Sequence, residues 1–378
     1  MESFGHGINK FAINLYSRLV SSEKNLFFSP YSIFCALALS HAGAAGRTLE
    51  HMSAVMSFPM DGDKMHCLNG KLMASLTRTH EEAEYKLKVA NSLWLQEGYP
   101  ILEKYVQFIE ETYHAAPRAA DFETSVESAR QSINRWVEDL TENLIRDLIP
   151  PDTLSELTRL ILVNAMYFKG YWVFAFDEEL TQEKPFKRGL SGGGERPVPM
   201  MFQTDEFWYM EEEDFQVLQL PYAGGDLAML AILPREVDGL ESIEKNLAAG
   251  NLEDWISKLR RETVQALLPK FKLSAGMMLG NVLRKMGMND AFSPEAADFS
   301  KITQREKIYL SEVAHQAFVE VNEKSTEAAA TAGIVDGLGE PEEPPKIYFF
   351  RADHPFVFMI RDQNSGSILF LGCLVDPE

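Results

Sequence analysis

Residues 318–333 read F-V-E-V-N-E-K-S-T-E-A-A-A-T-A-G, a run that begins as a strand and then changes character. Apolar and polar residues alternate over 318–322, as in a half-buried strand, but no large apolar residue follows until Ile334. In an extended chain every second side chain lies on the same face, so one face here is small at Thr326, Ala328, Ala330 and Ala332. Such a segment can enter between two existing strands without a steric clash.

The residues that follow oppose regular strand pairing. Glycine and proline recur at Gly337, Gly339, Pro341, Pro344 and Pro345. Proline lacks a backbone donor and glycine adds backbone freedom, so we expect the chain to be exposed here. An exposed segment of this composition is a preferred site of proteolysis.

This stretch resembles the hinge and reactive loop of the serpins, and the resemblance is to their intracellular, ovalbumin-like branch (clade B). The run Phe350–Phe356 resembles the strand that follows the loop in this family. Where the family usually has glycine before the hinge threonine, this chain has Ser325, which makes bending at the hinge less free. The hinge residues implied by the resemblance are Glu323, Ser325, Thr326, Glu327, Ala328, Ala329, Ala330 and Thr331.

The resemblance covers nearly the whole chain and implies its architecture. It implies an α+β fold, the serpin fold, with three β-sheets, about eight or nine helices and an exposed reactive-centre loop at about residues 323–349. We expect residues 1–378 to form a single domain, because no part of the chain has the composition of an interdomain linker.

Three local patterns predict particular elements. Ser29 and Pro30 predict the start of a helix, with the serine as its cap and the proline in its first turn. The continuous apolar run Leu160–Phe168 predicts a central strand that is buried on both faces. Residues 129–149 predict one amphipathic helix that stops at Pro150-Pro151. In the family this helix lies across the large sheet and gives way when the loop inserts.

The resemblance also implies two groups of site residues. Ser29, Ser32, Asn164 and His315 match the shutter, a small polar cluster beneath the central sheet at the point where the sheet opens. Trp172, which ends the run N-A-M-Y-F-K-G-Y-W, matches the breach, where the loop first enters the sheet. A buried hydrogen-bonded cluster can be satisfied in two arrangements, whereas interdigitated aliphatic side chains resist separation.

The charge of the chain limits the classes of partner that it can bind. The chain has 36 Lys and Arg residues against 56 Asp and Glu residues, a net charge of -20, which argues against nucleic acid as a partner. Heparin activation is not expected either, since the relevant helix offers only Lys71, Arg78 and His80 before an acidic run. A basic partner surface fits this charge better than an anionic one.

Cysteine usage and the N-terminus indicate the compartment. Cys35, Cys67 and Cys373 are few and odd in number, which is typical of a reducing compartment without a disulfide framework. The N-terminus lacks the features of a cleavable signal peptide, and the apolar run after Pro30 is short for a membrane span. We therefore expect a cytoplasmic protein with no membrane association, and release by a non-classical route stays open.

No constellation of catalytic or metal-binding residues stands out. The histidines and cysteines are scattered, with no His-x-x-x-His or Cys-x-x-Cys spacing that would suggest a metal site. The glycine-rich run 189–195 lacks the Gly-Lys-Ser/Thr ending of a phosphate loop and precedes Arg196-Pro197, not a helix. We expect a protein that is not an enzyme, holds no cofactor or metal and acts as a monomer.

By the resemblance, the function is protease inhibition by a suicide-substrate mechanism. A target protease forms an acyl-enzyme with the loop, the freed hinge inserts into the large sheet, and the attached protease is displaced and distorted. Counting about seventeen residues from Glu323, a length set by the strand rise, puts the reactive bond between Gly339 and Glu340. Counting back from Phe350 gives Glu342 instead. We prefer the first count because the cleaved arm must span the sheet.

Several targets follow from this position. Gly339 has no side chain for a trypsin-like or chymotrypsin-like pocket unless the bond after Leu338 is used, so an elastase-like serine protease is expected. A papain-like cysteine protease would recognise Leu338, and an Asp-directed protease would cleave after Asp336. A non-inhibitory serpin with a storage, chaperone or binding role stays open. Ser325 and the acidic, proline-rich residues 340–345 favour it, whereas the small-residue hinge argues against it.

Overall fold

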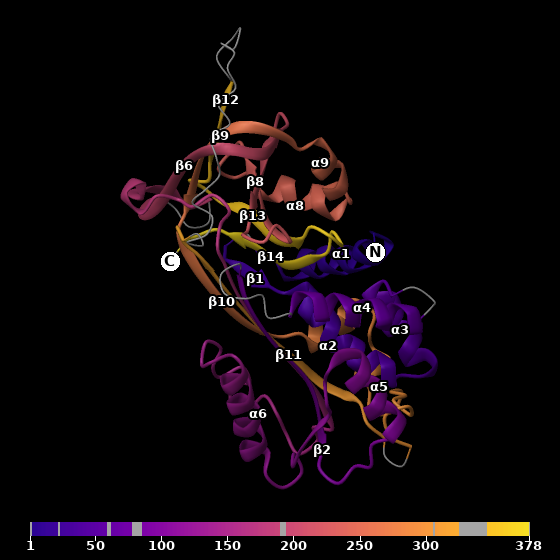
Figure 1. Ribbon diagram of the computed structural model, residues 1–378. Coiled ribbons are helices and arrows are strands. Elements are labelled where there is room, and N and C mark those ends of the chain that lie inside the picture. The colour runs from indigo at the N-terminus through magenta and orange to yellow at the C-terminus, as the bar shows by residue number, and fades with distance from the viewer. Residues whose placement is uncertain are drawn as a thin grey trace.

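The computed structural model describes residues 2–21, 23–58, 62–77, 85–189, 194–304, 307–324 and 346–377. The strands within these ranges form two β-sheets, and helices cover them (Figure 1). No helix in these ranges is long and apolar enough to span a membrane. The helices found there are α1 (Glu2–Leu19), α2 (Pro30–Gly43), α3 (Gly46–Met56), α4 (Gly62–Leu76), α5 (Glu103–Tyr113), α6 (Val126–Leu140), α8 (Leu240–Ala248), α9 (Leu252–Lys258) and α10 (Gly280–Lys285), with the 3-10 helices η1 (Glu178–Leu180) and η2 (Asp290–Phe292).

One sheet has five strands in the order β10-β11-β4-β2-β3. Strands β11 and β4 are parallel neighbours, whereas β10 is antiparallel to β11 and β2 is antiparallel to β4. Strand β3 is parallel to β2. The bounds of these strands are β10 (Phe271–Met278), β11 (Leu310–Val321), β4 (Leu160–Gly170), β2 (Tyr85–Gln96) and β3 (Arg118–Ala120).

Strand β4 is buried along almost its whole length, so the predicted strand with two buried faces is confirmed. Alternate side chains belong to two different cores, because successive residues of a strand point to opposite faces. Ile161, Val163 and Tyr167 pack with α6, whereas Leu162 and Phe168 lie in the larger core on the other face. The sheet is thus a partition between the two cores.

The second sheet has nine strands in the order β1-β14-β13-β8-β7-β6-β9-β12, with β5 also paired to β6. The resemblance implied three sheets, but the described strands form two hydrogen-bonded networks. Strand β6 joins them because it is 17 residues long and pairs with both β9 and β7. The bounds are β1 (Leu26–Phe28), β5 (Gln182–Lys187), β6 (Glu195–Glu211), β7 (Phe215–Pro221), β8 (Leu227–Pro234), β9 (Arg260–Pro269), β12 (Ile347–Arg351), β13 (Phe356–Asp362) and β14 (Ile368–Leu374).

Helix α2 begins where the sequence predicts. The hydroxyl of Ser29 accepts a hydrogen bond from the backbone N–H of Ser32 at 3.1 Å, and Pro30 occupies the first turn. Nearly all of its side chains are buried, as expected for a helix that is apolar all round. It packs against β2, β4 and β14 and so lies under the middle of the five-stranded sheet.

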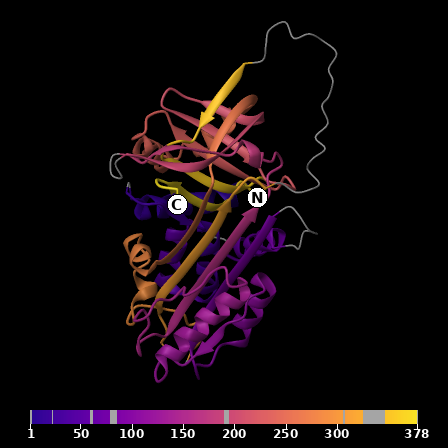
Figure 2. The same ribbon diagram turned by 90° about the vertical axis from the view of Figure 1, so that its left-hand side faces the viewer.

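Helix α6 covers the opposite face of that sheet (Figures 1 and 2). Ile133 and Val137 share a core with Ala90 and Trp94 of β2. An element placed here restrains β2 and β4, and it has to yield if the sheet is to widen.

The prediction of one helix over 129–149 is wrong beyond residue 140. The backbone of Glu142 and Asn143 has positive φ, 54° and 61°, which ends the helix. The side-chain amide of Asn134 then bonds the N–H of Ile149 at 2.9 Å and its carbonyl at 3.0 Å. These bonds fold the tail back along α6, so its apolar residues reach the same core without being helical.

Candidate functional site

The site is organised around the contact between β4 and β11, called the seam below. These strands pair in parallel over ten register positions, from Leu310 opposite Leu160 to Glu320 opposite Lys169. The chain leaves the seam at Asn322, beyond the last of these pairs. A segment that turned back from this point into the seam would run antiparallel to both strands. Antiparallel strands can be joined by a short turn, so no long crossover connection is needed.

A polar cluster lies on the α2 side of the seam and contains Ser29, Ser32, Asn91, Asn164 and His315. Asn164 is at its centre: its Nδ2 donates to the carbonyl of Ser32 at 3.1 Å and to the side chains of Ser32 and Asn91. Its Oδ1 accepts from Nδ1 of His315. Ser29, Ser32, Asn164 and His315 are fully buried. The structure therefore brings together the four residues that the resemblance implied for the shutter.

The hydrogen bonds determine the protonation of His315. The backbone N–H of Ser29 can only donate, and it lies 3.0 Å from Nε2 of His315. Nε2 is therefore the acceptor, and the single ring proton sits on Nδ1, facing Asn164. Burial lowers the pKa of His315 to about 3. The cluster requires the neutral histidine, because a second proton would point at the N–H of Ser29.

Asn91 is a member of this cluster that the sequence analysis missed. It lies opposite Asn164 in the β2–β4 pairing. The available signal was the pair of polar residues Asn91-Ser92 between apolar residues of the strand, in Val89-Ala90-Asn91-Ser92-Leu93. Its Nδ2 is buried without a hydrogen-bond partner in the described part of the chain, so the cluster is not fully satisfied.

The hydrogen bonds of the cluster depend on whether the seam is closed, because its members lie on both strands of the seam. Asn164 and His315 are register partners on adjacent strands. Placing one new strand between β4 and β11 would move them apart by about 4.8 Å. Their hydrogen bond exists only while the sheet has five strands.

We expect the free energy of unfolding to decrease as the pH falls below about 6.5, the ordinary pKa of histidine. Burial lowers the pKa of His315 and His66 to about 3 and that of His41 to about 4. Below pH 6.5 these histidines are protonated in the unfolded chain but stay neutral in the folded chain. Each histidine therefore lowers the free energy of unfolding by up to about 1.4 kcal/mol for each pH unit.

Urea unfolding at pH 7.5, 6.5, 5.5 and 5.0 measures this slope. The variant His315→Gln should have about one third less pH dependence over the same range, because one of the three histidines is gone. A slope that is the same in both proteins would contradict the assignment to His315.

Trp172 holds the chain where it leaves the seam. Its indole Nε1 donates to the carbonyl of Asn322 at 2.7 Å, and its backbone N–H donates to the carbonyl of Lys324 at 3.1 Å. The indole is buried and stacks on Tyr222, with ring centroids 4.5 Å apart. Release of the hinge therefore requires both hydrogen bonds to break.

Glu323 adds a second restraint at this position. Its carboxylate lies 2.8 Å from Nζ of Lys270 and accepts a hydrogen bond from the hydroxyl of Thr181 at 3.0 Å. Burial alone would raise the pKa of Glu323, but the bonds from Lys270 and Thr181 outweigh it and leave the pKa lowered. Neither Lys270 nor Thr181 was predicted, because the sequence carries no sign of pairs so far apart.

Removing the lysine should loosen the hinge. In Lys270→Met the carboxylate of Glu323, with its side chain only 5% exposed, loses its counter-ion. We expect a loss of about 2 kcal/mol of unfolding free energy, less than for a fully buried pair because the Lys270 side chain is 42% exposed. Urea unfolding measures the loss. In the matched double variant Lys270→Met/Glu323→Gln much of it should be restored, and a double variant as unstable as the single one would refute this account.

Comparisons with known proteins identify the family of this chain. The family model described as Serpin (serine protease inhibitor) matches residues 6–377. The chain belongs to the serpin family. Membership of this family supports protease inhibition in general terms. Proteases are then the partners of the protein, and its role is that of an inhibitor and not of a catalyst.

Individual relatives cover almost the full length of this serpin. An uncharacterized serpin-like protein of Thermococcus kodakarensis is 40% identical over 375 residues, covering 99% of this chain and 85% of its own. Serpin B6 of Pongo abelii is 38% identical, with both chains fully covered. The crystal structure of uncleaved ovalbumin matches with a TM-score of 0.89 at 31% identity, covering 99% of this chain and 100% of its own. The expected α+β serpin fold and its ovalbumin-like resemblance are confirmed.

Part of the predicted serpin site lies outside the described residues. This holds for most of the hinge (Ser325, Thr326, Glu327, Ala328, Ala329, Ala330 and Thr331), for the reactive-bond candidates (Asp336, Leu338, Gly339, Glu340 and Glu342) and for Arg78 and His80. Of the residues assigned to the hinge, Glu323 is the one that the structure places.

Among the described residues no group of three or more His, Cys, Asp or Glu side chains could hold a metal ion. The run 189–193 matches the Gly-x-Ser-x-Gly pattern of hydrolase nucleophiles, which the sequence analysis did not single out. Strand β5 ends at Lys187 and β6 begins at Glu195, and residues 190–193 of the run lie outside the described residues.

Proposed function

We propose that this serpin inhibits its target protease as a suicide substrate, by inserting the cleaved loop into the seam. The observation that supports this best is the parallel pairing of β4 and β11 over ten positions, with the hinge leaving the end of β11. A strand that enters there gains a hydrogen-bonding neighbour on both sides.

The chemical step is an ordinary acyl transfer that stops half-way. The serine hydroxyl of the protease attacks the carbonyl of the residue before the reactive bond, its proton passes through the protease base to the leaving amine, and the peptide C–N bond breaks. The acyl group stays on the protease, attached to the arm that begins at Glu323. The new amino terminus stays with the segment that continues into β12 (Ile347–Arg351).

Insertion then competes with deacylation. The arm of about seventeen residues, at roughly 3.3 Å each, carries the protease on the order of 55 Å. Displacement over this distance presses the enzyme against the far end of the inhibitor and distorts its active site before water can hydrolyse the ester.

The uncleaved state is held kinetically in this mechanism. The hydrogen bond between Asn164 and His315 and the bonds from Trp172 to Asn322 and Lys324 must break before a strand can enter. We assign the shutter role to the polar cluster and the breach role to Trp172 on this ground. Fold stability is then a matter of barriers as well as of equilibrium.

We place the reactive bond between Gly339 and Glu340, with an elastase-like serine protease as the target. A papain-like cysteine protease that reads Leu338 is the second candidate, and an Asp-directed protease that cleaves after Asp336 is the third. The non-inhibitory alternative has support from Ser325 at the hinge and from the similarity to ovalbumin.

One experiment separates these candidates. The protein is mixed with neutrophil elastase, chymotrypsin, granzyme B or cathepsin L, and the products are analysed on denaturing gels, with mass spectrometry of the released C-terminal peptide. A complex that survives denaturation supports inhibition, and the first residue of the peptide identifies the bond. Cleavage by all four enzymes without any complex would favour the non-inhibitory function.

We further propose that residues 1–378 act as one domain and as a monomer in a reducing compartment. Cys35 and Cys373 are buried as free thiols, and Cys67 is an exposed free thiol. An exposed thiol of this kind persists most readily where disulfides do not form. Light scattering with and without reductant tests the monomer, since a disulfide-linked dimer through Cys67 would appear only without reductant.

A further inference from the structure

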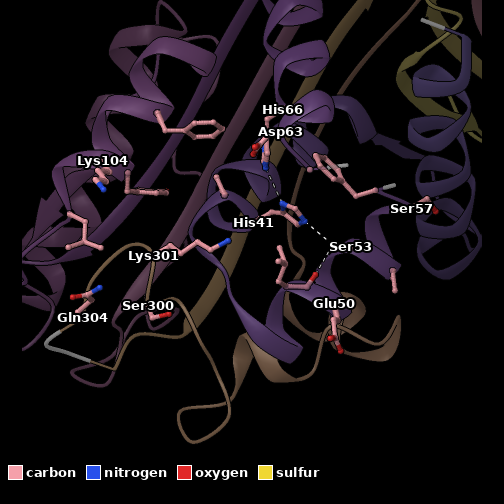
Figure 3. Close-up of a pocket in the computed structure, with 18 of the residues that line it drawn as sticks. His41, Glu50, Ser53, Ser57, Asp63, His66, Lys104, Ser300, Lys301 and Gln304 are labelled. Atoms are coloured by element: carbon pink, nitrogen blue, oxygen red, sulfur yellow. Dashed lines mark hydrogen bonds between the residues drawn. The ribbon is translucent and has the colours of Figure 1, made fainter. Parts of the chain in front are cut away.

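A cavity of about 1140 Å³ lies among α2, α3, α4, α5 and the segment 300–304, and nothing in the inhibitory mechanism uses it (Figure 3). Its volume slightly exceeds the range of about 300–1,000 Å³ that is typical of small-molecule sites. Aromatic and aliphatic side chains form much of its wall: Leu49, Phe58, Leu102, Tyr105 and Phe108. Phe58 and Tyr105 are themselves buried.

The polar part of the wall is a chain of hydrogen bonds with one direction. The hydroxyl of Ser53 donates to the carbonyl of Leu49 at 2.7 Å, so it accepts from Nε2 of His41 at 2.9 Å. Nδ1 of His41 is then the acceptor for Nε2–H of His66 at 3.1 Å, and Nδ1 of His66 accepts from the hydroxyl of Tyr113. Both histidines are neutral in this chain of hydrogen bonds, so this part of the wall carries no charge.

Lys301, an exposed residue, adds a positive charge beside these neutral histidines. Figure 3 shows its side chain extending toward His41 from the loop that also carries Ser300. Burial lowers the pKa of both His41 and His66, and the charge of Lys301 lowers each pKa further. No hydrogen bond or ion pair of the Lys301 ammonium is found with any described residue. In a chain with a net charge of -20, this cation has no assigned counter-ion.

Two carboxylates also line the cavity, and they do not neutralise this cation. Glu50 and Asp63 form no ion pair with Lys301 among the described residues, and Figure 3 shows Glu50 on α3, directed away from Lys301. Lys104 of α5 adds a second ammonium on the side of the cavity opposite α3. Lys10 of α1 also lines the cavity, so its lining has three lysines, Lys10, Lys104 and Lys301, against two carboxylates.

We propose that this cavity binds an organic anion, with an aromatic body against Phe58, Tyr105 and Phe108 and a carboxylate or sulfonate group against Lys301. Apolar surface supplies the affinity, and the charge-assisted hydrogen bond to Lys301 selects the anion. Because the cavity lies away from the seam, binding here does not depend on the inhibitory function proposed above.

Calorimetric titration of the full chain with naphthalene-2-sulfonate, and with the neutral analogue 2-naphthol, tests the proposal. We expect one sulfonate bound per chain, at least about tenfold more tightly than 2-naphthol, since a charge-assisted hydrogen bond contributes roughly that factor. The variant Lys301→Met keeps the aliphatic stem and should lose this preference. Its matched control, Lys307→Met, changes a nearby exposed lysine that does not line the cavity and should bind as the parent does.

A blocking variant locates the ligand. Ala54 is exposed at the cavity wall, so Ala54→Trp fills the space without disturbing the core and should reduce binding of the sulfonate at least about tenfold. Near-UV circular dichroism verifies that both variants keep the native packing. Absence of binding to the parent chain, equal affinity for the two probes, or unchanged binding in Lys301→Met or Ala54→Trp would each overturn the proposal.

Discussion

The variant Thr326→Arg is expected to form no covalent complex with the target protease and to be cleaved as an ordinary substrate. Thr326 is the first residue of the small face that must enter the seam. Strand β4 is buried on both faces here but β11 only on one, so a guanidinium on the small face, if that face enters toward the buried side, would be buried without a partner at a cost of several kcal/mol. A cost of about 4 kcal/mol slows insertion of the arm by roughly a thousandfold. The acyl-enzyme is then hydrolysed before the arm inserts, and the protease is released.

The measurement is the ratio of covalent complex to cleaved inhibitor on denaturing gels. The matched control is Ala329→Arg, which places the same side chain on the opposite face of the extended segment. It should retain much more inhibition than Thr326→Arg. Equal unfolding transitions of the uncleaved proteins would show that the native fold is intact. Full inhibition by Thr326→Arg would rule out insertion of the hinge as the mechanism.

Cleavage of the reactive loop is expected to raise the melting temperature of the protein by about 20 °C or more, a net stabilisation of roughly 15 kcal/mol in a chain of this size. Before cleavage the sheet has five strands, and Asn164 and His315 hold the seam closed. After cleavage the freed arm can fill the seam and satisfy the facing edges of β4 and β11 together. Most nicked proteins lose stability, so the sign of the change is diagnostic.

Thermal melts of intact and cleaved protein, followed by circular dichroism at several scan rates, measure this rise. The scan rate matters because the uncleaved state is held by a barrier. Cleaved Thr326→Arg serves as the control and should show a much smaller rise, since the same bond is cut but the arm is blocked. A cleaved parent protein that melts at or below the intact temperature would support the non-inhibitory function.

The sequence predicted several elements correctly where their structure depends on residues that are close together in the chain. The start of α2 follows from Ser29 and Pro30, because a cap and a first-turn proline act within four residues of chain. Strand β4 was predicted from a run that is apolar except at Asn164, since burial on both faces favours apolar side chains at almost every position. The helix that stops at Leu140 was predicted too long, because the turn depends on Asn134 reaching Ile149 across the fold.

The sequence by itself determined which segments could become strands and which face of the hinge is small, since both follow from the order of side chains along an extended chain. It also named Ser29, Ser32, Asn164 and His315, through the resemblance. Only the tertiary structure showed that Asn91 joins them and that Lys270 pairs with Glu323. These contacts, like the neutral state of His315, depend on atoms brought together from distant parts of the chain, and hydrogen bonds and burial act through space and not along the sequence.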